Sequence, residues 1–338
     1  MNIDLYPPSV REHCGLIGAC SFTDSDVKAL IIRGLEALQH RGQESWGVAL
    51  GGSLFKRLGL VSYVHERSFR ELEKMAGRVG IGHVRYSTRG RTVLANAHPI
   101  EIKAPERFYI AHNGTIADTR PLLEAIREGG LTVSDRLTDT ELIGIRLSQL
   151  LREGKDWPQA FEELRDLLNG SYCLLILTER DKLIAVRDEK GFRPLCLGWH
   201  EELESYIIAS ESCALDHLGA RFERDVEPGE IIIIDDGGMT THRFAEKGSH
   251  SHCSFEYTYF AHPSSYLEGR SVYGARKNIG RRLARMYGGD VDADVVIPIP
   301  DSARPGALGF SEELGIPLEE GLMKDRYRRK GSLRSFIL

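Results

Sequence analysis

The sequence predicts an α+β protein in two parts, a domain built on antiparallel sheet followed by the beginning of an α/β domain. At 338 residues the chain is too long for one ordinary hydrophobic core. Short apolar runs punctuated by turn residues fill residues 171–239, which is typical of antiparallel strands. After a polar, glycine-containing stretch at residues 246–252, a basic helix, an apolar strand and a second helix are predicted. We therefore expect one domain at residues 14–245 and the start of another at residues 246–338.

Composition excludes several classes of protein. The formal net charge is −5, with 49 acidic and 44 basic side chains interspersed, so no basic face for nucleic acid is expected. No apolar run reaches the roughly 18 residues that a membrane span needs, and residues 1–13 lack the features of a signal peptide. The six cysteines show neither a CxxC motif nor a paired metal-ligand spacing, which is typical of a reducing compartment. We expect a cytoplasmic enzyme without a membrane or nucleic-acid partner.

Cys14 opens an apolar run directly after a polar leader, and it is the first candidate for catalysis. A thiol is a useful nucleophile only when a nearby base takes its proton. The α-amino group of the same residue, with a pKa of about 7.7–8.0, can be that base. This chemistry requires Cys14 to be the first residue, so residues 1–13 would be a propeptide that is removed. The alternative is that Cys14 is a small buried apolar residue on a strand, as free cysteines often are.

The residues that follow Cys14 predict a strand, a helix and a polar loop in that order. Residues 15–22 are apolar and β-capable, and residues 23–26 supply an N-cap for a helix at residues 27–38. Residues 39–47 are polar and contain two glycines. This loop is either merely solvated or the lip of a site.

Three further positions carry polar groups at the ends of predicted elements. Arg85 ends an apolar strand, where it is either a surface residue or a planar fork that holds a carboxylate. The pair Asn113-Gly114 is by itself a turn signal, but its amide and backbone N–H are also suitable donors for an oxyanion hole. Asp139 begins a helix, as its N-cap, as the partner of a ligand ammonium, or as both.

The later part of the chain contains one misleading pattern and one βα unit. Residues 231–240 are similar to a signature that binds phosphoribosyl pyrophosphate, but Met239 interrupts the small-residue cradle that such a site needs. We interpret this segment as a hairpin that closes a sheet. Residues 274–287 predict a basic helix, and residues 295–300 predict a buried strand before a second helix. Ser302 lies after that strand, where parallel α/β sheets place ligands.

Five ordered motifs resemble the glutamine amidotransferase domain of the N-terminal nucleophile (Ntn) hydrolases. They are Cys14-Gly15, Gln39-His40-Arg41-Gly42-Gln43, Gly82-His83-Val84-Arg85-Tyr86-Ser87-Thr88, Ala111-His112-Asn113-Gly114 and Thr138-Asp139-Thr140-Glu141. Four further segments, at residues 191–195, 209–214, 226–230 and 253–260, are similar to the amidophosphoribosyltransferase family. The resemblance implies a four-layer αββα Ntn sandwich followed by the start of an α/β phosphoribosyltransferase-type domain.

The resemblance also implies a role for each candidate residue. Cys14 would attack the side-chain amide of glutamine, Arg85 would hold the α-carboxylate and Asp139 the α-ammonium. Asn113 and Gly114 would stabilise the oxyanion. The ammonia would pass to phosphoribosyl pyrophosphate and give 5-phosphoribosylamine, glutamate and diphosphate, the first step of purine biosynthesis. A full-length homo-oligomer is implied as well.

Two metal sites are implied by the resemblance alone. Ser302 matches a residue near the Mg²⁺ of the phosphoribosyl pyrophosphate site. Cys253 matches the first of four ligands to a [4Fe–4S] cluster, which one branch of the family has together with a propeptide. The acidic loop of the phosphoribosyl pyrophosphate site, the other three cluster cysteines and the remaining strands are expected beyond Leu338. We therefore expect the chain as given to bind no iron–sulfur cluster.

Two other functions remain as hypotheses. A stand-alone or truncated glutaminase would deliver ammonia to another acceptor, such as a sugar phosphate, or to a partner chain, and it would bind no phosphoribosyl pyrophosphate. A non-catalytic remnant would be favoured if residues 1–13 were never removed. The N-terminal residue of the purified protein discriminates between an active and an inactive chain.

Overall fold

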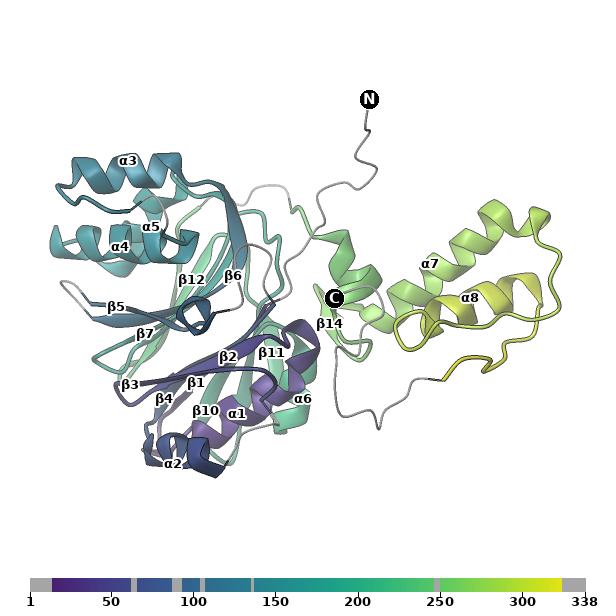
Figure 1. The fold of residues 1–338 in the computed structure, drawn as a ribbon, viewed down its shortest axis with the longest axis horizontal. Helices are drawn as coiled ribbons and strands as arrows, with labels where there is room; N and C mark the ends of the chain where they lie inside the picture. Colours follow the sequence, from purple (N-terminus) through teal and green to yellow (C-terminus); the bar gives the residue numbers. More distant parts are fainter. Residues whose placement is uncertain are drawn as a thin grey trace. The chain divides into compact units, whose positions relative to one another are not determined.

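The computed structural model describes residues 14–61, 66–86, 93–103, 107–134, 137–245 and 250–323. Outside these residues lie the predicted propeptide, Ser87, Thr88 and residues 246–249, the first part of the polar stretch. The chain divides into two compact units, Met1–His252 and Cys253–Leu338, whereas the sequence places the boundary between residues 245 and 246. Figure 1 shows both units, and each is described here by itself.

The first unit contains two antiparallel sheets. The seven-stranded sheet has the order β11 (Arg221–Asp225), β9 (Cys196–His200), β10 (Ser205–Ala209), β1 (Gly15–Ser21), β4 (Val79–Arg85), β2 (Ser45–Leu50) and β3 (Ser53–Leu58). The six-stranded sheet has the order β13 (Gly238–Arg243), β12 (Glu230–Asp235), β8 (Leu183–Arg187), β7 (Asn169–Thr178), β6 (Phe108–Asp118) and β5 (Ile100–Ile102). The strand that follows Cys14, β1, therefore has a partner on each side.

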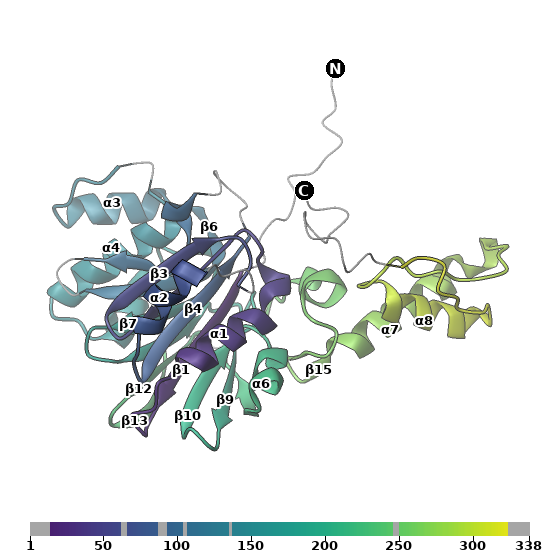
Figure 2. The ribbon, with the colours of Figure 1, turned by 60° about the horizontal axis from the view of Figure 1, so that its bottom comes forward.

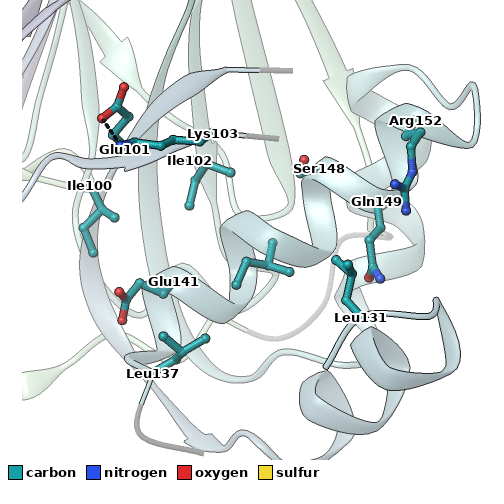
Figure 3. Close-up of a pocket in the computed structure, with 11 residues that line it drawn as sticks. Ile100, Glu101, Ile102, Lys103, Leu131, Leu137, Glu141, Ser148, Gln149 and Arg152 are labelled. Atoms are coloured by element: carbon teal, nitrogen blue, oxygen red, sulfur yellow. Dashed lines mark ion pairs between the residues drawn. The ribbon is translucent and has the colours of Figure 1, made fainter. Parts of the chain in front are cut away.

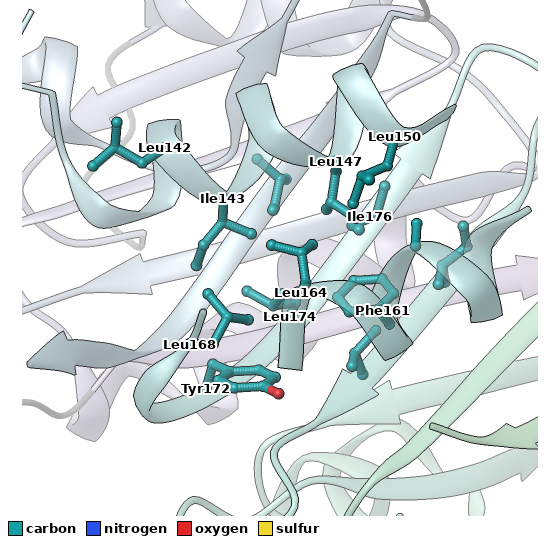
Figure 4. Packing of buried hydrophobic residues seen from close by; sticks show 14 of the residues in the cluster. Leu142, Ile143, Leu147, Leu150, Phe161, Leu164, Leu168, Tyr172, Leu174 and Ile176 are labelled. Carbon is teal, nitrogen blue, oxygen red and sulfur yellow. The ribbon is translucent and has the colours of Figure 1, made fainter. Parts of the chain in front are cut away.

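Helices cover the outer face of each sheet (Figures 1 and 2). The seven-stranded sheet packs against α1 (Lys28–Ala37), α2 (Glu66–Lys74) and α6 (Ser212–Leu218), and the six-stranded sheet against α3 (Arg120–Glu128), α4 (Asp139–Arg152) and α5 (Trp157–Arg165). Two short 3₁₀ helices, η1 (Gln39–Arg41) and η2 (Leu94–Asn96), lie in the connections. One core fills each helix–sheet layer, as Figure 4 shows for α4 and α5, and a third core lies between the sheets. The predicted four-layer αββα sandwich is confirmed.

Burial on both faces explains why the strands of this unit are continuous apolar runs rather than alternating ones. All seven residues of β1 are buried, because one face meets α1 and the other meets the second sheet. Gly34 on α1 is needed for this packing, since a Cβ there would lie 2.7 Å from Cγ1 of Ile17. The sequence thus seats the strand that carries Cys14 in the middle of the sandwich.

Three local expectations can be compared with the structure. The alternative that Asn113-Gly114 forms a turn is wrong, because β6 runs through both residues. Residues 231–240 form the predicted hairpin of β12 and β13 at the edge of the sheet. The interpretation of residues 171–239 as strands and turns missed α6, a helix of only seven residues whose apolar content is as high as that of a strand.

The second unit begins with η3, a π-helix at Glu256–Phe260, and a two-stranded ribbon of β14 (Tyr266–Leu267) and β15 (Arg270–Ser271). Two helices follow, α7 (Val272–Tyr287) and α8 (Arg304–Leu314), with the short η4 (Gly288–Asp290) between them. The helices approach closely through Gly280, where a Cβ would collide with the carbonyl oxygen of Gly306. No helix in the described part of either unit is long and apolar enough to cross a bilayer.

The prediction of a buried strand at residues 295–300 is wrong. This segment forms only an isolated parallel bridge between Val296 and Leu318, and Val295, Ile297 and Ile299 are 43–53% exposed. Apolar residues of strand type need neighbouring strands to cover their faces, and the described residues of this unit do not supply them.

Candidate active site

The pairing of β1 with β4 brings Cys14 next to Arg85. Gly15 lies opposite Val84, so the residue before β1 meets the last residue of β4. The Sγ of Cys14 is partly exposed and lies 3.9 Å from the carbonyl oxygen of Tyr86. A thiol in this position is supported by a buried strand and still accessible to a small molecule.

Arg85 presents an unused donor. Its Nη1 is buried and has no hydrogen-bond partner among the described residues, and neither has the buried Oγ of Ser45, which lies opposite Arg85 on β2. A buried guanidinium nitrogen without a partner is costly unless a ligand supplies one, and a carboxylate fits the planar fork of arginine.

Asn113, on β6, also has buried polar atoms without partners among the described residues. Its side chain is fully buried, and neither its Oδ1 nor its Nδ2 has a partner in the described part of the chain. Gly114 follows with φ of +154°, and a Cβ at this position would collide with the carbonyl oxygen of Ser171. Only glycine can stand here, so the backbone next to Asn113 is bare and a ligand can approach it closely.

Asp139 is anchored beside β6 at the start of α4. Its Oδ2 accepts a hydrogen bond from the backbone N–H of Ile116 at 3.1 Å, and its Oδ1 accepts one from the N–H of Thr140 at 2.8 Å. Asp139 is not the N-cap, because Thr138 occupies that position and forms a capping box with Glu141. The carboxylate is about one-quarter exposed, which leaves it available to a ligand cation.

Three buried histidines connect these elements. The Nε2 of His83 lies 3.0 Å from the carbonyl oxygen of His112, and the Nδ1 of His98 accepts the backbone N–H of His112 at 3.3 Å. The Nδ1 of His112 lies 3.0 Å from the Oγ1 of Thr140. Burial lowers the pKa of His83 to about 3 and lowers the pKa of His98 and of His112 as well. Neutral rings thus join β4, β6 and α4, the elements that carry Arg85, Asn113 and Asp139.

Sequence reasoning assigned no role to Arg41 and Glu211, which the structure places directly behind Cys14. The Nε of Arg41 donates to the carbonyl oxygen of Cys14 at 2.9 Å, and its Nη1 donates to Oε1 of Glu211 at 2.5 Å. Arg41 is also close enough to Cys173, the cross-strand partner of Asn113, to oppose the rise that burial causes in the pKa of that thiol. The available signal was a charged residue at the end of an apolar strand, since Glu211 follows Ile207, Ile208 and Ala209 almost directly.

Three cavities of about 310–460 Å³ lie elsewhere. One of about 310 Å³ lies between β5 and α4, where Ile102, Glu141 and Gln149 contribute to its walls (Figure 3). Cys14, Arg85 and Asn113 do not line it. The candidate active site is therefore defined by its unpaired polar groups rather than by the size of a cavity.

The described residues do not fit the two metal sites that the resemblance implies. Ser302 lines a cavity of about 370 Å³ whose other walls come mainly from apolar residues of α7, α8 and residues 296–299, with no carboxylate among them. Mg²⁺ prefers several oxygen ligands. Cys253 is buried, and among the described residues no second cysteine joins it in a group that could hold a metal. Neither Mg²⁺ nor a four-thiolate cluster is supported by these residues.

The fold and the site together define a glutamine amidotransferase domain. The family model of that description, "Glutamine amidotransferase domain", matches residues 83–217, which include Arg85, Asn113, Asp139 and Glu211. The sequence is 42% identical to an amidophosphoribosyltransferase from Methanocaldococcus jannaschii, over 96% of this chain and 71% of that protein. It is 41% identical to an amidophosphoribosyltransferase from Synechocystis, over 94% of this chain and 64% of that protein. The chain belongs to the amidophosphoribosyltransferase family.

A solved structure of the same family supports this assignment. Glutamine phosphoribosylpyrophosphate amidotransferase from B. subtilis, complexed with ADP and GMP, matches with a TM-score of 0.81 and 36% identity. The match covers 93% of this chain and 67% of that one. The chain thus spans about two-thirds of the length of these relatives.

Proposed function

We propose that the first unit hydrolyses the side-chain amide of glutamine at Cys14, after removal of residues 1–13 frees the α-amine of Cys14. The amine takes the proton of the thiol, and the thiolate attacks the amide carbon. The tetrahedral intermediate collapses when the ammonium returns its proton to the leaving nitrogen, which departs as ammonia. Water then attacks the γ-glutamyl thioester, so that glutamate is released and the thiol is restored.

The observation that carries this proposal is a set of buried, unpartnered polar groups on β2, β4 and β6, in the same sandwich as β1, the strand that follows Cys14. Buried polar atoms are nearly always hydrogen-bonded, so a cluster without partners marks a place prepared for a polar ligand. Among the described residues of β2, β4 and β6 they include Ser45 Oγ, His83 Nδ1, Arg85 Nη1, Asn113 Oδ1 and Nδ2, and Thr115 Oγ1.

Glutamine complements these groups. Its α-carboxylate would pair with Arg85 and its α-ammonium with Asp139, which leaves the side-chain amide to reach Cys14. The oxyanion formed there would accept hydrogen bonds from the Nδ2 of Asn113 and the backbone N–H of Gly114. Each of these roles is part of the proposal.

We further propose that the ammonia serves the synthesis of 5-phosphoribosylamine from phosphoribosyl pyrophosphate in the full-length enzyme. Glutamate and diphosphate are the other products, and the reaction belongs to cytoplasmic purine biosynthesis. The names of the relatives support this acceptor over the alternative of a stand-alone glutaminase. A magnesium ion and a homo-oligomer belong to the same proposal for the full-length form.

The proposal is tested by maturation and by hydrolysis. N-terminal sequencing should find Cys14 as the first residue of active protein. Cys14→Ala should release no glutamate from glutamine while its circular dichroism stays unchanged. Protein that retains Met1 or Asn2 and still hydrolyses glutamine would refute the role of the α-amine.

A further inference from the structure

We propose that Glu211 is a positioning residue for the nucleophile, acting on Cys14 through Arg41. This inference rests on the proposed function of Cys14. Glu211 lies 197 positions after Cys14 in the sequence, at the N-cap of α6.

The need for such a residue follows from the chemistry of Cys14. A residue whose own α-amine is the catalytic base must be the first residue of the chain, and chain termini fray unless they are tied down. The last restraint from β pairing falls on Gly15, which lies opposite Val84. The carbonyl group of Cys14 is a backbone group by which the fold can orient the amine and the thiol.

Arg41 binds this carbonyl group. Its Nε donates to the carbonyl oxygen of Cys14 at 2.9 Å, and its side chain is completely buried. A buried guanidinium requires a compensating anion. Glu211 supplies it, with Oε1 at 2.5 Å from Nη1 of Arg41 and a side chain that is also completely buried.

Glu211 is itself held in one orientation and one charge state. The Nε2 of His40 lies 2.8 Å from the same Oε1. Burial raises the pKa of Glu211, but the charges and hydrogen bonds of His40 and Arg41 outweigh burial and hold that pKa well below its usual value. The carboxylate is therefore ionised throughout the working range of the enzyme.

The residue before Glu211 holds the same end of β1. The backbone N–H of Ser210 donates to the carbonyl oxygen of Leu16 at 3.0 Å, and the N–H of Leu16 donates to Oγ of Ser210 at 2.9 Å. The two residues that lead into α6 thus restrain residues 14–16 at two points, one direct and one through Arg41. This arrangement assigns the segment a positional role rather than a role in general stability.

A metal site would be the other use of this cluster. His40 Nε2, a carboxylate oxygen of Glu211 and Sγ of Cys213 lie within 4.8 Å of one another. The guanidinium of Arg41 already occupies the carboxylate and would repel a cation, so the contacts favour positioning.

The test compares Glu211→Gln with Glu230→Gln in the processed chain. Glu230 is a matched control, because it is almost fully buried and bonds both nitrogens of Arg224 at 2.7 and 2.8 Å, but it lies on β12 and contacts none of the site residues. The steady-state release of glutamate gives kcat and KM, and the circular dichroism spectrum and thermal midpoint report on folding. Wild type and Cys14→Ala are assayed first, which tests the proposed function separately.

We expect Glu211→Gln to lower kcat by about 10²-fold, since misplacement of a reacting group by an ångström has that effect. Its KM should stay within about twofold, because Arg85 and Asp139 are untouched. Glu230→Gln should keep kcat within about threefold. Arg41→Lys, which retains the buried charge next to Glu211 but cannot reproduce both contacts, should match Glu211→Gln, and the double variant should be no worse than either.

Three results would overturn the proposal. The first is a folded Glu211→Gln variant with the kcat of wild type. The second is an equal loss in Glu230→Gln, which would mean that breaking any ion pair of a buried glutamate has this effect. The third result concerns the case in which Glu211→Gln does not fold. An Arg41→Lys variant that folds with an unchanged kcat would then overturn the proposal. If wild type itself releases no glutamate and Cys14→Ala behaves identically, the proposed function fails, and the positioning role of Glu211 fails with it.

Discussion

Replacement of Asn113 by leucine should make the first unit more stable and inactive at the same time. The amide of Asn113 is completely buried, and both of its polar atoms lack partners in the described part of the chain. Leucine has the same branched arrangement of side-chain heavy atoms, a somewhat larger volume and no polar atom to desolvate. The substitution therefore removes an unfavourable term from the folded state without opening a cavity.

The size of the effect follows from the two polar atoms. A buried polar group without a partner costs about 1–3 kcal/mol in mutational data, so the free energy of unfolding should rise by about that amount. In a domain of this size, each kcal/mol shifts the thermal midpoint by roughly 2–4 °C. We expect the midpoint of Asn113→Leu to rise by several degrees. Loss of an oxyanion donor should lower kcat by about 10²–10³.

Gln149→Leu is the matched control. Gln149 is an equally buried amide, but its Nε2 donates to the carbonyl oxygen of Ile126 at 3.0 Å and its Oε1 accepts from Arg146 at 3.2 Å. Replacement there removes both hydrogen bonds and should lower the midpoint while kcat changes little. Thermal denaturation followed by circular dichroism and a glutamate-release assay give both quantities. The reasoning is refuted if Asn113→Leu lowers the midpoint as Gln149→Leu does.

The remaining predictions concern the substrate clamp, acid stability and the second unit. Arg85→Lys should raise the KM for glutamine sharply, because a point charge cannot reproduce a bidentate fork, and an unchanged KM would remove Arg85 from the site. Burial lowers the pKa of His83 to about 3, so between about pH 6.5 and 3 the unfolded chain binds a proton that the folded chain does not. The free energy of unfolding should therefore fall by about 1.4 kcal/mol per pH unit on acidification in that window, and urea titrations of His83→Gln should lack this contribution. Cys253 has no further cysteine in a metal-ligating group of the described residues, so purified protein should contain no stoichiometric iron and sulfide. Among the described residues no carboxylate lines the cavity next to Ser302, so the 338-residue chain alone should release no diphosphate from phosphoribosyl pyrophosphate, with glutamine or with ammonia. Measured turnover would mean that the phosphoribosyl site lies elsewhere, with residues 231–240 as the first to reconsider.

Much of the first unit could be predicted because its signals are local. The capping box at Thr138, the apolar run after Cys14 and the turn at Asp236-Gly237 depend on neighbours within a few positions. The contact of Glu211 with Arg41 could not be predicted, because it joins residues 170 positions apart and depends on the register of β1 with β10.

Residues 295–299 illustrate the opposite error. Their sequence is that of a buried strand, but a strand is buried only by what packs on it. In the described part of the second unit Ile297 and Ile299 are 44% and 53% exposed and the segment forms only an isolated bridge, so a correct local pattern led to a wrong expectation of a buried strand. Propensity describes what a segment can do, and the surroundings decide whether it does so.

The central position of β1 also determines when the candidate site can form during synthesis of the chain. One neighbour, β4, is complete at Arg85, but the other, β10, ends only at Ala209, and Glu211 follows it. A nascent chain cannot assemble the surroundings of Cys14 until more than two hundred residues have left the ribosome. The proposed nucleophile is therefore among the first residues to be made, and its surroundings are among the last to be completed. A growing polypeptide that hydrolysed glutamine prematurely would consume it without use. Because β10 is made late, the strand order alone postpones the proposed activity until the sandwich has closed.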